Sequence, residues 1–175
     1  MLDQYTTLHE YQNYLNARLG EAEQDSPPPL LAITAANMRW LLEPVETEGV
    51  AHAQDITPVP HTSPCFIGLS NVRGTLYAVS DLSRLAGAQA TVSERQAKLV
   101  LVSHRYESNA ALLVDGDVQL CRRNLFSLAA EPTRDDSEGF PAWSEALYQD
   151  SSNEAWRMIN LPTLLKSREF MEIGA

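Results

Sequence analysis

From Leu30 onward, the apolar residues of this chain come in short runs that are bounded by turn residues. Such spacing is typical of a strand-rich fold. The candidate strands are LLAIT (30–34), CFIGLSNV (65–72), TLYAVSDL (75–82), AKLVLVS (97–103) and WRMINL (156–161). The run that begins at Met38 ends at Pro44, because proline cannot donate a hydrogen bond to a strand ladder. We therefore predict a mainly β fold.

The strongest local signal is ALLVDGDVQLC (111–121), in which two apolar runs flank Asp115 and Gly116. An Asp-Gly pair suits the positive φ angles of a two-residue hairpin turn. We therefore expect the two runs to pair with each other as a β-hairpin.

Helical spacing is found near the two ends of the sequence. Residues 1–29 contain an apolar stripe followed by three consecutive prolines, and the stripe consists of Tyr5, Leu8, Leu15 and Leu19. After Pro162, helical spacing returns at Leu164, Leu165, Arg168 and Met171. We expect residues 1–29 to be an amphipathic helix with a Pro-rich linker, and residues 30–175 to be one domain that ends in a helix.

The net charge of −10 is concentrated in two segments. Residues 1–30 hold five acidic residues and one Arg, and residues 131–154 hold seven acidic residues and one Arg. Nucleic acids and anionic lipids are bound mainly by Lys and Arg, so neither is expected as a partner. The polar segment 129–154 is expected to be an acidic insertion, and a solvated loop is favoured there over a charge-reading role.

The apolar runs also bear on location. None approaches the roughly 20 residues that span a bilayer, and the first residues lack the pattern of a secretory signal. We therefore expect a cytoplasmic protein without membrane insertion. In that compartment, Cys65 and Cys121 are expected to be buried thiols.

Side chains with catalytic or metal-binding potential form no recognisable constellation in the sequence. The four histidines include no pair at metal-ligand spacing, and no Gly-rich phosphate loop is present. Asp81 and Asp115 lie at the ends of candidate strands, where Asp is an ordinary turn residue. We predict no catalytic residue, no metal and no cofactor, and an enzyme that uses these two carboxylates is the least favoured alternative.

The segment PCFIGLSNVRGTLYAVSDLSRL (64–85) carries the most specific pattern in the chain. An apolar strand is followed by a turn, a second strand and an Asp-Leu pair, and the turn is Asn71, Val72, Arg73 and Gly74. This order resembles the signature of CheW-like chemotaxis adaptor domains, and weaker matches extend the resemblance over residues 30–168. Ala78 stands where the family commonly has proline. The extra N-terminal segment is more similar to the PilI branch, the adaptors of twitching-motility systems.

The resemblance implies two interleaved five-stranded SH3-like barrels that share an apolar seam, with an N-terminal and a C-terminal helix. It implies a non-catalytic scaffold that couples a methyl-accepting chemoreceptor to a CheA-type histidine kinase in arrays at the membrane. The family places the signature arginine beside a groove between the barrels that takes the receptor signalling tip. The expected receptor-binding residues are therefore Asn71, Val72, Arg73 and Gly74. The expected residues for binding the kinase regulatory domain are Val45, Thr47 and Gly49.

The chemistry of the turn can also be interpreted without the family. Gly74 permits a backbone conformation that a Cβ would oppose, and Asn71 can hydrogen-bond the backbone across the turn. The guanidinium of Arg73 suits either of two tasks, binding neighbouring carbonyls or contacting a partner. The alternative for the whole chain is a β-barrel peptide-binding module that uses an exposed strand edge.

Overall fold

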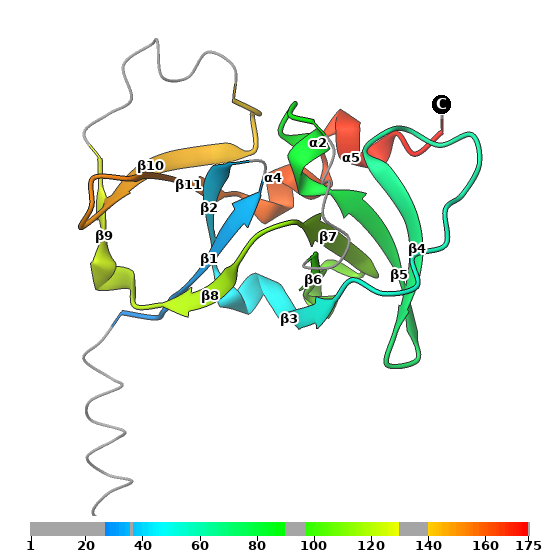
Figure 1. The fold of residues 1–175 in the computed structure, drawn as a ribbon, viewed down its shortest axis with the longest axis horizontal. Coiled ribbons are helices and arrows are strands. Elements are labelled where there is room, and N and C mark those ends of the chain that lie inside the picture. Colours follow the sequence, from blue (N-terminus) through cyan, green and yellow to red (C-terminus); the bar gives the residue numbers. More distant parts are fainter. Residues whose placement is uncertain (1–26, 36, 90–96, 130–139, 175) are drawn as a thin grey trace, which may run out of the picture.

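The computed structural model describes residues 27–35, 37–89, 97–129 and 140–174, whose fold is shown in Figure 1. These residues form eleven strands, which are β1 (Leu30–Ala35), β2 (Met38–Leu42), β3 (Thr47–His52), β4 (Phe66–Val72), β5 (Thr75–Asp81), β6 (Lys98–Val102), β7 (Ala110–Val114), β8 (Val118–Cys121), β9 (Phe126–Leu128), β10 (Ser144–Asp150) and β11 (Ala155–Ile159). The helices are α2 (Leu82–Leu85), α4 (Leu161–Leu165) and α5 (Arg168–Met171). Three 3-10 turns are η1 (Pro44–Glu46), η2 (His104–Tyr106) and η3 (Arg123–Leu125). The predicted N-terminal helix lies outside the described residues.

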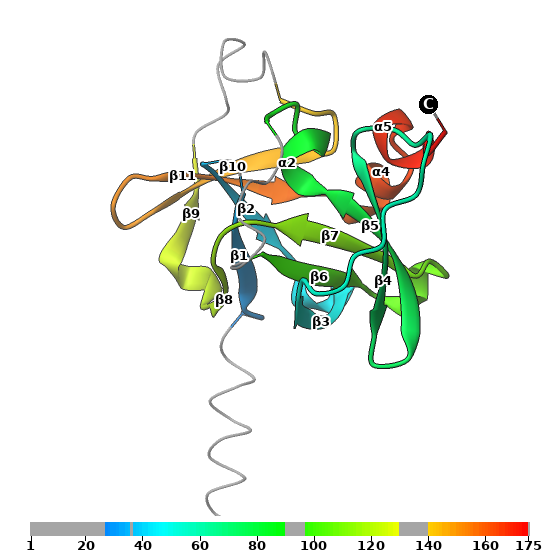
Figure 2. The same cartoon turned by 45° about the vertical axis from the view of Figure 1, so that its right-hand side comes forward.

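The strands form two sheets, which Figures 1 and 2 show side by side. One has six strands in the order β8-β1-β2-β11-β10-β9, and the other has five in the order β3-β6-β7-β5-β4. The prediction of a mainly β fold is confirmed. The predicted pair of five-stranded barrels is not found among the described residues, because one sheet has six strands and strand pairing closes neither sheet.

The predicted hairpin at Asp115 and Gly116 is wrong. Strand β7 pairs with β5 and β6, whereas β8 pairs with β1 in the other sheet, so the turn is a crossover between sheets. The Asp117 N–H donates to Thr34 Oγ1 at 2.8 Å, and the Thr34 N–H donates to the Asp117 carbonyl at 3.0 Å. A Cβ on Gly116 would lie 2.1 Å from Thr34 Oγ1, and Gly116 has no positive φ. Glycine is required here for close approach to β1.

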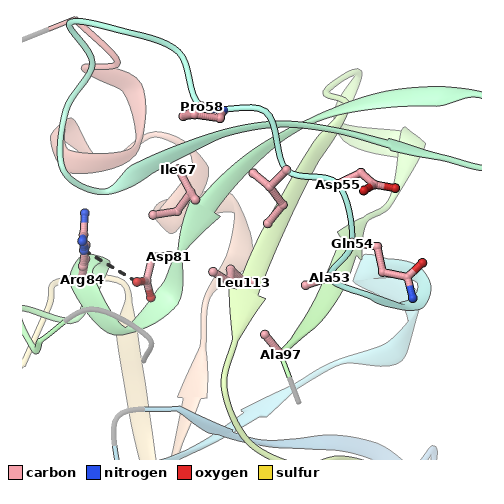
Figure 3. Close-up of a pocket in the computed structure, with 10 residues that line it drawn as sticks. Ala53, Gln54, Asp55, Pro58, Ile67, Asp81, Arg84, Ala97 and Leu113 are labelled. Carbon is pink, nitrogen blue, oxygen red and sulfur yellow. Dashed lines mark ion pairs between the residues drawn. The ribbon is translucent and has the colours of Figure 1, made fainter. Parts of the chain in front are cut away.

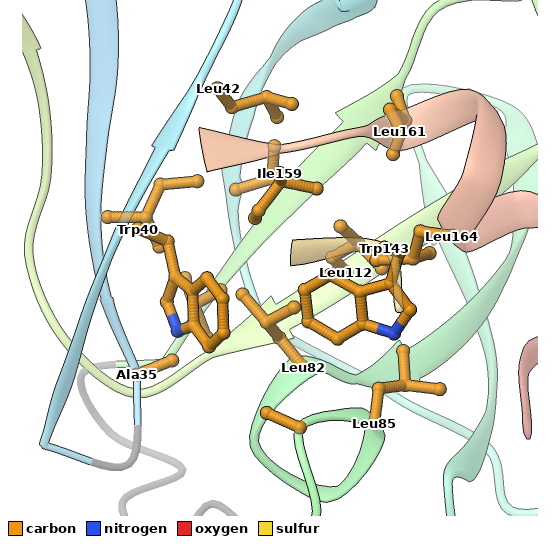
Figure 4. Packing of buried hydrophobic residues seen from close by; sticks show 14 of the residues in the cluster. Ala35, Trp40, Leu42, Leu82, Leu85, Leu112, Trp143, Ile159, Leu161 and Leu164 are labelled. Atoms are coloured by element: carbon orange, nitrogen blue, oxygen red, sulfur yellow. The ribbon is translucent and has the colours of Figure 1, made fainter. Parts of the chain in front are cut away.

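An apolar seam lies between the two sheets. The Trp40 ring from β2 and the Trp143 ring before β10 are buried, with their centroids 5.1 Å apart. Figure 4 shows these rings beside Leu82, Leu112 and Ile159, which come from α2, β7 and β11. Both sheets and the helices therefore contribute to one core.

Strands β1, β2, β6 and β7 bury apolar side chains on both faces. In β6, Val100 and Val102 pack in the seam, whereas Leu99 and Leu101 pack inside the five-stranded sheet. Strand β1 divides its residues between the seam and the interior of the six-stranded sheet in the same way. Antiparallel strands that face water on one side alternate apolar with polar residues. Burial on both faces explains why these strands are mostly apolar and do not alternate strictly with polar residues.

The acidic segment is partly strand. Ser144–Asp150 forms β10, which pairs with β9 and β11, so the expectation of a loop is wrong for these residues. Tyr148 of this strand packs in the apolar cluster inside the six-stranded sheet. Residues 130–139 lie outside the described residues.

The C-terminal helical pattern forms two short helices rather than one. Helix α4 ends at Leu165, and Ser167 begins α5 by accepting the Phe170 N–H on its Oγ at 3.3 Å. Serine competes for backbone hydrogen bonds in this way, which favours a cap over a helix interior.

Candidate functional site

The signature turn is a tight hairpin between β4 and β5. Val72 pairs with Thr75, which leaves Arg73 and Gly74 as the central residues, with φ of 53° and 90°. Positive φ at both central positions is the pattern of a type I′ turn. Asn71 Oδ1 accepts the Gly74 N–H at 2.9 Å. The predicted roles of Asn71 and Gly74 within the turn are confirmed.

Arg73 is exposed at this turn. Among the described residues, its guanidinium has no hydrogen bond or ion pair. The interpretation in which Arg73 binds neighbouring carbonyls therefore finds no support. The five donors of the guanidinium are free for another molecule.

Val45, Thr47 and Gly49 lie at the start of the edge strand β3. Val45, in η1, is 66% exposed, and Thr47 and Gly49 are half-buried. Pairing with β6 shifts register between Thr47 and Gly49, where Gly49 has a φ of 147°. An edge strand offers unpaired backbone groups to a partner.

Glu48 connects this edge strand to two other elements. The Tyr77 hydroxyl of β5 donates to Glu48 Oε2 at 3.0 Å, and the His104 N–H of η2 donates to Glu48 Oε1 at 2.9 Å. Burial and the bond to Glu48 raise the pKa of the Tyr77 hydroxyl. Neither contact was predicted from the sequence, where the alternation of Glu46 and Glu48 was the only available signal.

Glu46 makes a second, similar anchor. The Tyr106 hydroxyl donates to Glu46 Oε1 at 3.0 Å, and Arg105 Nη2 lies 3.5 Å from the same oxygen. Burial raises the pKa of Glu46 above its ordinary value, and the Tyr106 hydrogen bond and Arg105 charge offset this in part. Two carboxylates therefore hold η1 and β3 against η2.

A model of the CheW-like domain matches residues 29–169, which is most of the chain. The chain belongs to the CheW-like domain family. None of the curated proteins compared with the chain matches it.

The fold of this CheW-like domain is similar to a solved structure, the crystal structure of the scaffolding protein TtCheW from Thermoanaerobacter tengcongensis. The two share 20% sequence identity with a TM-score of 0.64, and the match covers 85% of this chain and 99% of TtCheW. The likeness extends to nearly all of that chain and supports the fold.

The CheW-like domain has a cavity of about 590 Å³ inside the five-stranded sheet. Figure 3 shows that Ile67 and Leu113 line it on one side and Ala53 and Ala97 on another. Its walls are mainly apolar, and the charged side chains of Asp55, Asp81 and Arg84 also line it.

The carboxylates of the enzyme alternative are Asp81, the last residue of β5, and Asp115, which directly follows the neighbouring strand β7. Asp81 pairs with Leu113 of β7, two residues before Asp115. Asp81 is 1% exposed, and its Oδ1 accepts the Ser83 N–H at 2.9 Å, which begins α2, while Oδ2 lies 3.7 Å from Arg84 Nε. Capping of α2 therefore accounts for the burial of Asp81, and no group of metal ligands occurs among the described residues.

A second cleft of about 590 Å³ lies between α2, residues 140–143 and the helices α4 and α5. Its lining includes Arg84, Phe140, Trp143 and Lys166. This cleft adjoins α2, whereas the turn at Arg73 lies at the other end of the seven-residue strand β5, roughly 23 Å away. Arg73 is not among the residues that line this cleft.

The described part of the chain also contains two cysteines. Cys65 and Cys121 are both free and half-buried, and burial raises the pKa of the Cys65 thiol. No helix there has the length and apolar character needed to cross a membrane.

Proposed function

We propose that this CheW-like domain is a non-catalytic adaptor that couples a methyl-accepting chemoreceptor to a CheA-type histidine kinase. Membership of the family over residues 29–169 supports the proposal. The observation that carries it is the exposed Arg73, which has no partner among the described residues and is fixed on a type I′ turn. A free guanidinium in a defined backbone geometry suits recognition of carbonyls or carboxylates on another protein.

In this proposal, the two partners occupy two surfaces of the five-stranded sheet. The receptor signalling tip contacts the turn from Asn71 to Gly74, and the kinase regulatory domain contacts Val45, Thr47 and Gly49. Because both surfaces belong to one hydrogen-bonded sheet, the adaptor holds receptor and kinase in a defined relative position. A small shift of the receptor then changes the balance between kinase states.

We extend the proposal to a twitching-motility array of the PilI type, at the cytoplasmic side of the membrane. Support comes from the apolar stripe and the prolines of residues 1–29, of which residues 1–26 lie outside the described residues. The proposal of an adaptor does not depend on this extension.

Co-purification with a kinase regulatory domain and with a soluble receptor signalling tip tests the proposal. We expect the wild type to retain both, Arg73→Ala to lose the receptor tip, and Val45→Asp to lose the kinase domain. Arg122→Ala is the matched control, because Arg122 is equally exposed but follows β8 in the other sheet. Retention of neither partner by the wild type would contradict the proposal. Binding of extended peptides alone would favour the peptide-binding module.

A further inference from the structure

We infer that Glu48 is a positioning residue that physically joins the signature turn to the edge strand β3. The inference rests on the proposed function, because that function assigns the turn to the receptor and β3 to the kinase. Glu48 itself belongs to neither of the proposed contact sets.

The first half of the connection runs from the turn to Glu48. Tyr77 follows Gly74 by three residues on β5 and is 4% exposed, and its hydroxyl donates to Glu48 Oε2 at 3.0 Å. In the order of the sheet, β6 and β7 lie between β3 and β5. The Tyr77–Glu48 hydrogen bond therefore joins β5 directly to β3 across the curved sheet. It adds to the backbone hydrogen bonds that connect these strands through β7 and β6.

The second half of the connection fixes Glu48 in place. Its Oε1 accepts the backbone N–H of His104 at 2.9 Å and lies 2.9 Å from His104 Nε2. The Glu48 side chain is 21% exposed, although the residue as a whole is exposed, and the side chain of His104 is 67% exposed. Both carboxylate oxygens are thus engaged, one toward β5 and the other toward η2. A displacement of Tyr77 changes the position of the carboxylate and of the β3 backbone that carries it.

Strand β3 depends on such side-chain contacts at this point. Its ladder to β6 is irregular between Thr47 and Gly49, the two residues that flank Glu48. It is also an edge strand, so no second ladder holds it. The anchors at Glu48 therefore have a large share in setting the position of Thr47 and Gly49.

The structure supplies a matched control for this connection. Tyr106 donates to Glu46 at 3.0 Å, the same distance and chemistry as Tyr77 to Glu48, but Tyr106 belongs to η2 rather than to β5. Tyr106→Phe removes one hydroxyl from the same region and leaves the connection to the turn intact. A general loosening of β3 would appear in both Tyr→Phe variants.

Amide hydrogen exchange, measured by NMR, tests the connection without any partner. Gly74→Ala strains the turn, because Gly74 has a φ of 90°. We expect Gly74→Ala to speed exchange of the β3 and His104 amides by about two- to tenfold, the range equivalent to one ordinary hydrogen bond. In a Tyr77→Phe background, the same change should have no effect on these amides. In a Tyr106→Phe background, the effect should persist.

Two additional variants keep the test decisive. Asn71→Ala removes the acceptor of the Gly74 N–H and is a second perturbation of the turn, should Gly74→Ala fail to fold. Glu48→Ala removes both acceptor oxygens, and with them both connections, so it should abolish the effect of the turn on the exchange of the β3 and His104 amides. An equal effect of the turn perturbation in wild type and Tyr77→Phe would overturn the inference. So would the absence of any effect in wild type. Failure to capture the kinase or receptor would instead overturn the proposed function.

Discussion

Gly116 lies so close to Thr34 that a Cβ on Gly116 would be 2.1 Å from the Thr34 Oγ1 and 2.5 Å from the Thr34 carbonyl oxygen. This contact is at the crossover where the chain leaves the five-stranded sheet and joins β1. Next to it, Asp117 exchanges hydrogen bonds with Thr34, which positions the start of β8 against β1.

Gly116→Ala is therefore expected to destabilise the fold. The added methyl must displace backbone of β1, and overpacking of this kind costs about 1–3 kcal/mol. Urea denaturation measures the loss in the free energy of unfolding. Gly174→Ala is the control, since a Cβ there meets no atom within 4 Å. An equal free energy of unfolding for the two variants would show that the crossover accommodates the added methyl group without loss of stability.

Arg73→Ala is expected to weaken binding of the receptor tip by about 1–3 kcal/mol, the loss typical of charge-assisted hydrogen bonds. The melting temperature should stay unchanged, because Arg73 has no partner among the described residues. Isothermal titration calorimetry and thermal unfolding measure the two quantities. Arg73→Lys should restore only part of the affinity if the planar fork is recognised. A large loss of stability with unchanged affinity would assign the residue to the fold alone.

Glu46→Gln tests the cost of burying a carboxylate under η2. Because burial raises the pKa of Glu46, the folded protein holds the proton more tightly than the unfolded chain does. Stability from this group is present at low pH and is lost as pH rises through the folded pKa. We expect the wild type to lose stability relative to Glu46→Gln as pH rises from about 4, the ordinary pKa of a Glu side chain, through the raised pKa of Glu46. Urea denaturation across this range measures the difference.

The control for this pH effect is Glu107→Gln, which removes an exposed carboxylate from the adjacent turn. Its stability should run parallel to that of the wild type over the same range. If the free energy of unfolding of Glu46→Gln also runs parallel to that of the wild type across this pH range, burial does not destabilise the charged form of Glu46.

Deletion of residues 1–26 is expected to leave the sheets intact. The apolar clusters of the described residues are built from the strands and helices after this segment. Residue Pro28 is kept in the deletion, because its carbonyl accepts a hydrogen bond from Arg123 Nε at 3.1 Å. Circular dichroism should retain its β signal. Complete unfolding would show that the deleted segment belongs to the core.

Local chemistry predicted the elements well where a few neighbouring residues determine them. Asn71 and Gly74 specify the turn between β4 and β5, and both the turn and the flanking strands were predicted. The same reasoning failed at Asp115 and Gly116, where an identical kind of signal serves a crossover. The two glycines differ in backbone conformation, because Gly74 has a positive φ and Gly116 does not, and in what a Cβ would meet. The neighbour of Gly116, Thr34, is distant in the sequence.

Sheet membership and the connection through Glu48 could not be predicted for the same reason. Tyr77 and Glu48 are 29 residues apart, and a single hydroxyl and a single carboxylate have many possible partners in a chain of this length. The apolar runs of β1 and β6 indicated strands, but not which neighbours cover their two faces. Strands of a buried parallel sheet have the same continuous apolar pattern.

In the sequence, the strands of the five-stranded sheet lie between β2 and β8 of the six-stranded sheet, and this order affects folding during synthesis. The six-stranded sheet combines β1 and β2 with β8 to β11, which follow the five-stranded sheet in the sequence. It therefore cannot be completed until β11 has left the ribosome. Until then, Trp40 and Leu42 lack the apolar partners Trp143 and Ile159. Exposed apolar strands of this kind are prone to aggregate. A nascent chain that stalls after β7 is therefore a natural substrate for chaperones, although its five-stranded sheet is already complete.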